Sequence, residues 1–280
     1  MRYVLYNPLS THCLPLSDLA KELRNVSPEE DMQFVDATKI EDYEKFMKGL
    51  KKDDDLVISG GDGTLNKSIN FVDFSKYPNK IYLHKAGNGN DFLRDINELK
   101  EDFIEITEYV KNLPTVKIGE YTSKFINGVG LGVDGMVCVE SDKMKAKGKK
   151  NINYTSLSIR LLLTKFKRFN VDVVVDGKEY KFKHCFIASA MLGKYYGGGM
   201  KEAPDQDRRN DVVSVVIWHN LWSLTALMNF PKIFTGEHVL KTKKITVLTG
   251  KNIELKCSRP TDVQIDGESI HGILGYSVKR

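Results

Sequence analysis

The chain of 280 residues is poor in the residues that build disulfide and metal frameworks. It has four cysteines and six histidines. The cysteines, Cys13, Cys138, Cys185 and Cys257, lie far apart with no paired spacing, and the histidines show no metal-ligand spacing. These absences argue against a disulfide scaffold and against a zinc site. We therefore expect reduced, buried thiols and histidines that are structural or exposed.

The start of the sequence shows no pattern of a secretory leader. Residues 1–8 contain no basic region followed by an apolar core, so no signal peptide is expected. Neither sign of charge dominates, because 42 Lys and Arg against 37 Asp and Glu leave a net charge of +5. A charge this small and this evenly spread does not favour a nucleic-acid partner. We predict a cytoplasmic chain, with the inner face of the membrane as a peripheral location.

A transmembrane run is lacking as well. Residues 212–234 are the longest apolar stretch and approach the ~20 residues that cross a bilayer. The β-branched start of this stretch, His219-Asn220 and Pro231 favour a strand over 212–218 and a helix over 221–229 that Asn220 caps. The side chains of this helix either pack in the core or form an apolar wall for lipid chains.

A basic segment leaves two interpretations open. Five lysines lie between Lys143 and Lys150, and residues 151–169 follow with an apolar stripe at helical spacing and four further cations. Such a surface can lie on anionic lipid. The alternative is a solvated lysine loop followed by a helix that packs on a sheet.

The length and a balance of 41% apolar and 28% charged residues suit two domains. No repeat of fixed period is present, and the hydrophobic period changes near residue 115. Before it, strands alternate with helices, which are expected over 18–26, 40–50 and 103–110. After it, strands are expected over 115–119, 124–127, 171–175, 182–190, 212–218, 244–248 and 252–257. The pattern predicts an α/β domain followed by a β-rich domain.

The most informative motif is Gly60-Gly61-Asp62-Gly63-Thr64. It follows the apolar run Leu56-Val57-Ile58, which is typical of a buried parallel strand, and precedes a helix-like stretch over 65–72. Glycines let the backbone approach a ligand, and Thr64 could cap the helix whose N-terminus would face an anion. Asp62 fits a phosphate site if it points at a magnesium ion or its water. The alternative is a strand-to-helix turn without a ligand.

Neither the P-loop pattern nor the Gly-x-Gly-x-x-Gly pattern is present. Gly-Gly-Asp-Gly-Thr instead resembles the motif that diacylglycerol kinases, sphingosine kinases and NAD kinases share, and that phosphofructokinases parallel. The resemblance implies ATP as the ligand. A second glycine turn, Ala86 to Phe92, follows a predicted strand over 80–84. It resembles the Gly-Thr-x-Asn-Asp-Phe motif of the lipid kinases, with Asn88 in place of the threonine.

Three further segments extend the resemblance to this lipid kinase family. Asn7-Pro8 resembles the opening Asn-Pro, and residues 125–135 resemble the run of asparagine, glycine and aspartate that enters the second domain. Val263 to Glu268 resembles Val-Asp-Gly-Glu. The resemblance implies a nucleotide domain of residues 1–115 plus about 268–280, a β-sandwich-like acceptor domain of residues 116–267, and an active site in the cleft between them.

The resemblance also implies roles for single residues. Asp266 would be the general base, with Glu268 in support and Asp62 as a further catalytic carboxylate. The residues implied in ATP binding are Asn7, Thr38, Gly60, Gly61, Asp62, Gly63, Thr64, Asn66, Asn88, Asn90 and Asp91. The alternative for Asp266-Gly267 is a plain turn, as expected for Asp176-Gly177 between the arms of a hairpin.

The magnesium site is the least regular part of the pattern. The family's metal-linked Asp-Gly-Leu corresponds to residues 203–213, which lack the glycine. Asp211 is the ligand if one residue has been deleted, and Asn210 takes that position if none has. Asp205, Asp207 and a plain acidic turn are the alternatives.

The function that these residues favour is an ATP- and Mg²⁺-dependent lipid kinase that phosphorylates a hydroxyl group of diacylglycerol or a related lipid. Its expected partners are a lipid substrate at the membrane surface and, as an open alternative, a second copy in a homodimer. A kinase of a soluble nucleotide or sugar is the first competing hypothesis. A nucleotide-binding regulator without turnover is the second, because Asn88, His84 and residues 210–212 depart from the family pattern.

Overall fold

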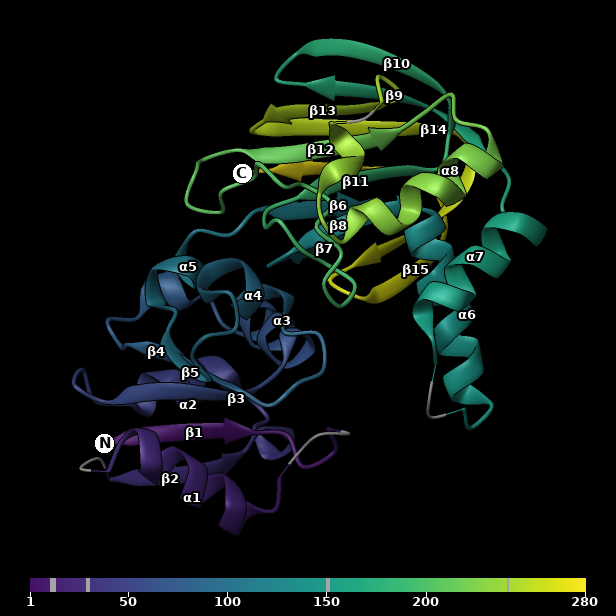
Figure 1. Ribbon diagram of the computed structural model, residues 1–280. Coiled ribbons are helices and arrows are strands. Elements are labelled where there is room, and N and C mark those ends of the chain that lie inside the picture. The colour runs from purple at the N-terminus through teal and green to yellow at the C-terminus, as the bar shows by residue number, and fades with distance from the viewer. Residues whose placement is uncertain (11–13, 29–30, 150–151, 241) are drawn as a thin grey trace. The chain divides into compact units, whose positions relative to one another are not determined.

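The computed structural model describes residues 1–10, 14–28, 31–149, 152–240 and 242–280 (Figure 1). The chain divides into two compact units, Met1–Leu113 and Pro114–Arg280. The division lies where the hydrophobic period of the sequence changes. Cys13, Lys150 and Asn151, which took part in the predictions, lie outside the described residues.

The first unit is an α/β domain around a five-stranded mixed sheet. The strand order is β2-β1-β3-β4-β5, and every neighbouring pair is parallel except β4 and β5. Apolar residues of β1, β3 and α1 form a buried cluster, Val4, Val57, Leu19 and Leu23. The elements are β1 (Arg2–Tyr6), α1 (Leu16–Val26), β2 (Met32–Asp36), η1 (Ala37–Lys39), α2 (Tyr43–Gly49), β3 (Asp55–Gly60), α3 (Asp62–Phe71), η2 (Phe74–Lys76), β4 (Ile81–Lys85), α4 (Asp91–Asn97), β5 (Phe103–Glu105) and α5 (Thr107–Lys111).

Two helix predictions in this unit need correction. The helix expected over 40–50 begins only at Tyr43, because the side chain of Asp42 caps it by accepting from the amide of Lys45. The helix expected over 103–110 is instead β5 followed by the short α5. Tertiary pairing outweighs helical spacing here, because β5 pairs antiparallel with β4 and the Phe103 ring stacks on Tyr82 at 5.1 Å.

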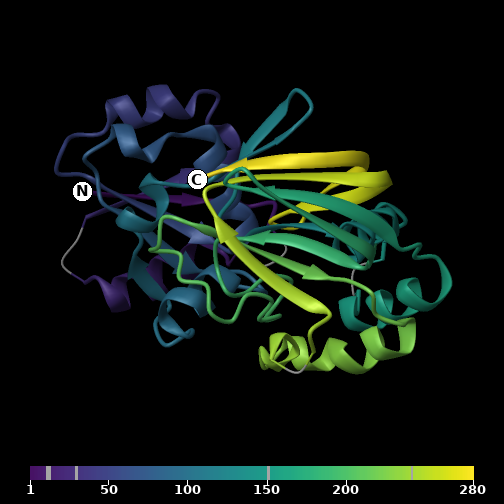
Figure 2. The same ribbon diagram turned by 90° about the horizontal axis from the view of Figure 1, so that it is seen from above.

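The second unit is built on a ten-stranded antiparallel sheet of order β13-β12-β11-β8-β14-β15-β6-β7, with β9 pairing β14 and β10 (Figures 1 and 2). Helices α6, α7 and α8 pack over one part of it around Phe186, Trp218 and Leu161. The elements are β6 (Thr115–Ile118), β7 (Tyr121–Lys124), β8 (Gly128–Gly132), α6 (Val133–Ala146), α7 (Tyr154–Thr164), β9 (Phe169–Val175), β10 (Lys178–Cys185), β11 (Ile187–Met191), β12 (Val213–Trp218), α8 (Ser223–Asn229), η3 (Phe230–Ile233), η4 (Glu237–Val239), β13 (Ile245–Gly250), β14 (Asn252–Ile265) and β15 (Glu268–Lys279).

The end of the chain corrects the predicted domain division. Residues 268–280 were assigned to the first domain, but they belong to the second unit. They form β15, which pairs with β14 along most of its length and with β6 at its end. These backbone hydrogen bonds make the last strand an interior part of the second sheet.

Smaller differences follow from the same sheet. Residues 125–127 join β7 to β8, 182–190 divide into two strands, and 252–257 are the first part of the longer β14. The helix expected within 151–169 covers only Tyr154–Thr164. Asn220 does not cap the next helix: its φ of +52° is left-handed, and α8 begins at Ser223. None of the helices that the structure describes is long and apolar enough to cross a membrane.

Candidate functional site

The residues predicted to bind ATP follow the carboxyl ends of four neighbouring parallel strands. Asn7 follows β1, Thr38 follows β2, Gly61 to Thr64 follow β3, and Asn88 to Asp91 follow β4. Open α/β sheets bind ligands at this edge, next to the point where the strand order reverses. In the order β2-β1-β3-β4-β5 that point lies between β1 and β3. The sheet therefore brings these predicted residues to one edge.

The two glycine turns touch through their backbones. The amide of Ala86 donates to the carbonyl oxygen of Gly60 at 3.2 Å. A Cβ atom built on Gly87 would lie 2.4 Å from the Cα atom of Gly61, and one built on Gly61 would lie 2.8 Å from the Cα atom of Gly87. Only residues without a side chain allow this approach. The turns that follow β3 and β4 therefore form one structural unit.

Asp62 joins the first turn to the helix that follows the second. Its two carboxylate oxygens accept hydrogen bonds from the amides of Asp91 and Phe92, each at 2.9 Å. A carboxylate at the N-terminus of α4 is favourable because it satisfies N–H groups that have no partner within the helix and faces the positive end of the helix dipole. From the sequence, magnesium or its water was the only partner expected for Asp62. In the structure, the backbone amides at the start of α4 bind this carboxylate.

Thr64 does not cap α3. The helix begins at Asp62 and its N-cap is Gly61, so no side chain caps it. The Thr64 side chain instead covers Gly60, where an added Cβ would lie 2.4 Å from its hydroxyl oxygen. Asn66 is buried two residues further along the same helix.

The second turn ends at Asn90, which has a left-handed φ of +49°. Its side-chain amide donates to the carbonyl oxygen of Gly87 at 2.5 Å, and its Oδ1 atom is buried with no partner among the described residues. Asp91 is buried beside Arg94, and Asn88 is exposed. Asn90 thus fixes the turn, while Asn88 is open to a ligand.

Asn7 and Thr38 make local bonds at the same edge. The amide of Leu9 donates to Oδ1 of Asn7 at 3.0 Å. The Thr38 hydroxyl donates to Asp36 at 2.6 Å and lies exposed. Hydrogen bonds of this kind stabilise turns at the ends of strands. Ligand binding by Asn7 and Thr38 stays a prediction.

Replacing Gly87 by alanine is expected to destabilise the first unit. The new methyl group would overlap the Gly61 backbone, so the free energy of unfolding should fall by roughly 1–3 kcal/mol. Gly63→Ala is the matched control, because nothing lies within 4 Å of its added Cβ and alanine favours a helix by up to about 1 kcal/mol. Urea unfolding followed by circular dichroism compares the two. Equal stability of both variants would contradict the backbone contact between the turns.

In the second unit, Asp266 lies in the two-residue turn between β14 and β15. Asp266 and Gly267 have φ values of +47° and +95°, as in the hairpin turns that favour Asp-Gly. The carboxylate of Asp266 accepts from the amides of Ile126 at 2.6 Å, Asn127 at 2.9 Å and Gly128 at 2.9 Å. Two of the segments that carried the family resemblance therefore meet at one carboxylate.

Arg208 supports this loop and was missed in the sequence. Its buried guanidinium donates to the carbonyl oxygen of Ile126 at 3.0 Å and to Oδ1 of Asn127 at 3.2 Å. Arg208 lies in the segment 203–213, whose acidic residues were the predicted magnesium ligands. Its sequence neighbours Asp207 and Arg209 are charged, so no local signal marked Arg208 as a buried residue.

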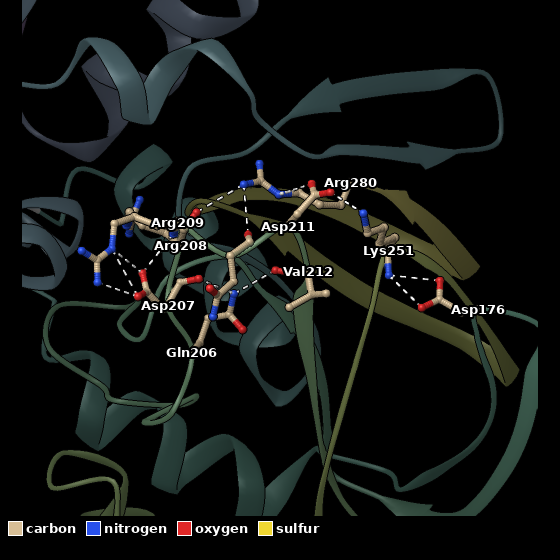
Figure 3. A network of polar contacts seen from close by, with 10 residues as sticks. Asp176, Gln206, Asp207, Arg208, Arg209, Asp211, Val212, Lys251 and Arg280 are labelled. Carbon is tan, nitrogen blue, oxygen red and sulfur yellow. Dashed lines mark hydrogen bonds and ion pairs between the residues drawn. The ribbon is translucent and has the colours of Figure 1, made fainter.

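Asp176 shows that such bonds also occur without catalysis. The Asp176-Gly177 turn joins β9 to β10, which confirms the predicted hairpin. Its carboxylate accepts from the amide of Lys251 at 3.1 Å (Figure 3). It also accepts from the amide of Asn252 at 2.8 Å. The interpretation of Asp266-Gly267 as a hairpin turn is therefore correct too. The catalytic role of Asp266 remains a prediction. Glu268, its predicted support, is exposed at the first residue of β15.

The structure does not support Asp211 as a magnesium ligand. Its exposed carboxylate is paired with the ammonium group of Lys251 and lies 3.9 Å from Nε of Arg280, and the Lys251 charge lowers its pKa (Figure 3). Asp207 is paired with Arg209 at 2.7 Å, which lowers the pKa of Asp207 to about 2. Within the described ranges no group of three or more His, Cys, Asp or Glu could hold a metal ion.

A buried polar cluster of the second unit strongly shifts the pKa of a carboxyl group. The carboxylate of Asp134 accepts from the hydroxyl groups of Tyr196 at 2.7 Å and Ser189 at 3.0 Å. Burial of this carboxylate, reinforced by the charge of Glu202, raises the pKa of Asp134 to about 7. Burial also raises the pKa of Glu202, which accepts from Nε1 of Trp218 at 3.1 Å. The sequence analysis included Asp134 only as part of the segment 125–135, which resembles the family, and predicted no role for its side chain.

The comparisons with known proteins also divide the chain into two parts, with the boundary a few residues after that of the compact units. Residues 2–121 match the diacylglycerol kinase catalytic domain, and residues 127–276 match the YegS C-terminal NAD kinase beta sandwich-like domain. The second match alone covers more than half of the chain.

Related proteins agree with these domain matches. A Bacillus subtilis (strain 168) protein is 27% identical over 76% of this chain and 73% of its own length. A Staphylococcus aureus (strain MRSA252) protein is 26% identical over 90% of this chain and 82% of its own, and both are named "putative lipid kinase". The crystal structure of a diacylglycerol kinase from Bacillus anthracis str. Sterne has a TM-score of 0.64, with 18% identity over 100% of this chain and 93% of that one. The chain belongs to the diacylglycerol kinase-like lipid kinase family of the NAD kinase-like superfamily.

Proposed function

We propose that the chain transfers the γ-phosphoryl group of ATP to a hydroxyl group of diacylglycerol or a related lipid. The observation that carries the proposal is the joining of the two glycine turns, in which Gly61 meets Gly87 and Asp62 caps α4. Fixed turns beside the N-terminus of α3 suit the binding of phosphates. Membership in a lipid kinase family supports the reaction class.

In this reaction the acceptor hydroxyl attacks the γ-phosphorus, and the bond from that phosphorus to the β,γ-bridging oxygen breaks. ADP leaves, and the hydroxyl proton passes to a base. Asp266 is the proposed base, because the backbone of residues 126–128 and Arg208 fix its position. Asp62 acts in this proposal as a positioning residue that holds α4 against the first turn.

Magnesium does not fit a cage built by the protein alone. Asp211 faces two cations, and the described residues offer no cluster of ligands. Magnesium often keeps its waters and binds through substrate phosphates. It therefore enters the proposal as part of the nucleotide substrate, and no step is assigned to a protein-bound ion.

Labelled ATP and Mg²⁺ with two panels of acceptors test the proposal. The purified chain is incubated with lipids in detergent micelles, including diacylglycerol and sphingoid bases, and separately with nucleosides and sugars. Label should appear in the lipid fraction alone. Label in a soluble product would identify a kinase of soluble alcohols, and ATP binding without any product would identify a regulator. Either result would overturn the proposal.

A further inference from the structure

The surface around α8 is unusual because it exposes large apolar side chains on a short, uncharged helix. Residues 223–229 contain no charged residue. The inner face of the helix is buried through Ala226 and Asn229, while Trp222 just before it is 72% exposed and Leu224 and Met228 are 68% and 66% exposed. A helix at the surface normally carries polar residues on the face that points to solvent. The outer face of α8 therefore lacks its cover within the described chain.

The exposure is not confined to α8. Phe234, after η3, and Leu240, after η4, are also exposed, so five of the exposed large apolar residues fall within 222–240. Figures 1 and 2 place α8 beside α7, and η3 and η4 continue from it along the chain. We name these five residues, Trp222, Leu224, Met228, Phe234 and Leu240, the α8 surface. Exposed large apolar residues that gather in one region mark sites of interaction.

Behind the α8 surface the unit is well filled. The seam between α7 and α8 leaves a cavity of only about 20 Å³, lined by Leu162, Phe186, Leu227 and other apolar residues. A cavity of that size holds at most about one water molecule. Leu227 thus packs inward, as one of the two interpretations of the sequence expected, while Trp222 and Met228 do not.

In the sequence, the segments next to the α8 surface carry mostly positive charge. Residues 152–169 and 219–244 together carry eight Lys and Arg against one acidic residue, Glu237. One of the eight, Lys165, is ion-paired with Glu140 of α6. Three others make hydrogen bonds with residues of α8 or of the segment that precedes it. Lys232 donates to Asn229 at 3.2 Å, Arg168 donates to the carbonyl oxygen of Leu221 at 3.3 Å, and the backbone of Lys244 bonds to His219 at 2.9 Å.

We propose that the α8 surface docks on an anionic phospholipid bilayer, with Trp222, Leu224 and Met228 entering the interface. Tryptophan is favoured at the boundary between headgroups and acyl chains, and cations near the surface strengthen binding to anionic lipid. A second copy of the chain fits less well, because a twofold contact through this surface would oppose the same cations. The inference rests on the lipid acceptor of the proposed function, since docking would bring the enzyme to that lipid.

The two tryptophans of the chain provide a direct measurement. Trp218 is 1% exposed and Trp222 is 72% exposed. Without nucleotide, vesicles that contain phosphatidylglycerol should shift the tryptophan emission to shorter wavelength, and vesicles of phosphatidylcholine alone should shift it far less. Trp222→Ser should abolish the shift, while the emission of Trp218 shows that the unit remains folded.

Sedimentation with the same vesicles gives the size of the effect. Met228→Ser should weaken binding about tenfold, and removing the charge of Lys232 with Lys232→Gln should weaken it about fivefold. Leu274→Ser is the matched control, because Leu274 is an exposed apolar residue of β15 in the same unit. It should leave vesicle binding unchanged.

Several results would overturn the docking proposal. They are the absence of an emission shift on anionic vesicles, equal loss of binding in Met228→Ser and Leu274→Ser, or self-association in solution that Trp222→Ser abolishes. Phosphoryl transfer to lipid in detergent micelles does not require docking on a bilayer. A failure of the proposed function can therefore be distinguished from a failure of this surface.

Discussion

Asp266→Asn is expected to lower the turnover number for lipid phosphorylation by about 10²–10⁴-fold, the usual contribution of a positioned general base. The affinity for ATP should be unchanged, because the glycine turns that would bind the nucleotide belong to the other compact unit. The measurement is the rate with labelled ATP and diacylglycerol in micelles, together with ATP binding by calorimetry.

Asp176→Asn is the matched control for this substitution. Both aspartates occupy the first position of an Asp-Gly hairpin turn, and both carboxylates accept from backbone amides. Each asparagine would turn an amide group toward some of these donors and lose hydrogen bonds worth about 1–3 kcal/mol. Stability should therefore fall in both variants, and only Asp266→Asn should lose activity. Full lipid phosphorylation by Asp266→Asn, or equal loss in both, would contradict the role of Asp266 as base.

Asp134→Asn is expected to change how the stability of the second unit depends on pH. Because burial raises the pKa of Asp134 to about 7, the folded state favours the neutral acid, whereas the unfolded chain ionises near its ordinary value of 3.8. The stability from this group is complete below pH 4 and is lost as pH rises through 7. Between pH 5 and 8 the loss should amount to about 2–3 kcal/mol.

Asparagine removes this loss because it cannot ionise, and its carbonyl oxygen can still accept from Tyr196 and Ser189. Relative to the parent protein, the variant should become more stable as pH rises from 5 to 8. Urea unfolding followed by tryptophan emission reports on the second unit, which contains both tryptophans. Asp172→Asn, at an exposed position, is the control. If the stability of Asp134→Asn and that of the parent protein changed with pH in parallel, Asp134 would not be a buried acid with a raised pKa.

Sequence patterns predicted the first unit well where a signal was local. The strand that ends at Gly60 and the turns of both glycine motifs follow from glycines placed directly after short apolar runs. That these turns touch depends on β3 and β4 being neighbours in the sheet, which the strand order shows. The partner of Asp62 could not be predicted, because it is a backbone amide 29 residues away.

The second unit was harder because its signals are long-range. The spacing of residues 268–280 is that of any strand, and only the pairing partner β14 decides to which unit they belong. The bonds of Asp266 to residues 126–128 span 138 to 140 positions. The support that Arg208 gives to residues 126–127 and the raised pKa of Asp134 both depend on burial. Composition and hydrophobic periodicity do not reveal which polar residues are buried.

The most direct test of the proposed function follows the fate of two phosphorus atoms. The purified chain is given diacylglycerol in micelles with ATP labelled in either the γ- or the α-phosphate. Transfer to the lipid hydroxyl predicts label in the extracted lipid from γ-labelled ATP, none from α-labelled ATP, and none from either with Asp266→Asn. Bound ATP with no label in lipid, or label from the α-phosphate, would contradict phosphoryl transfer by this chain.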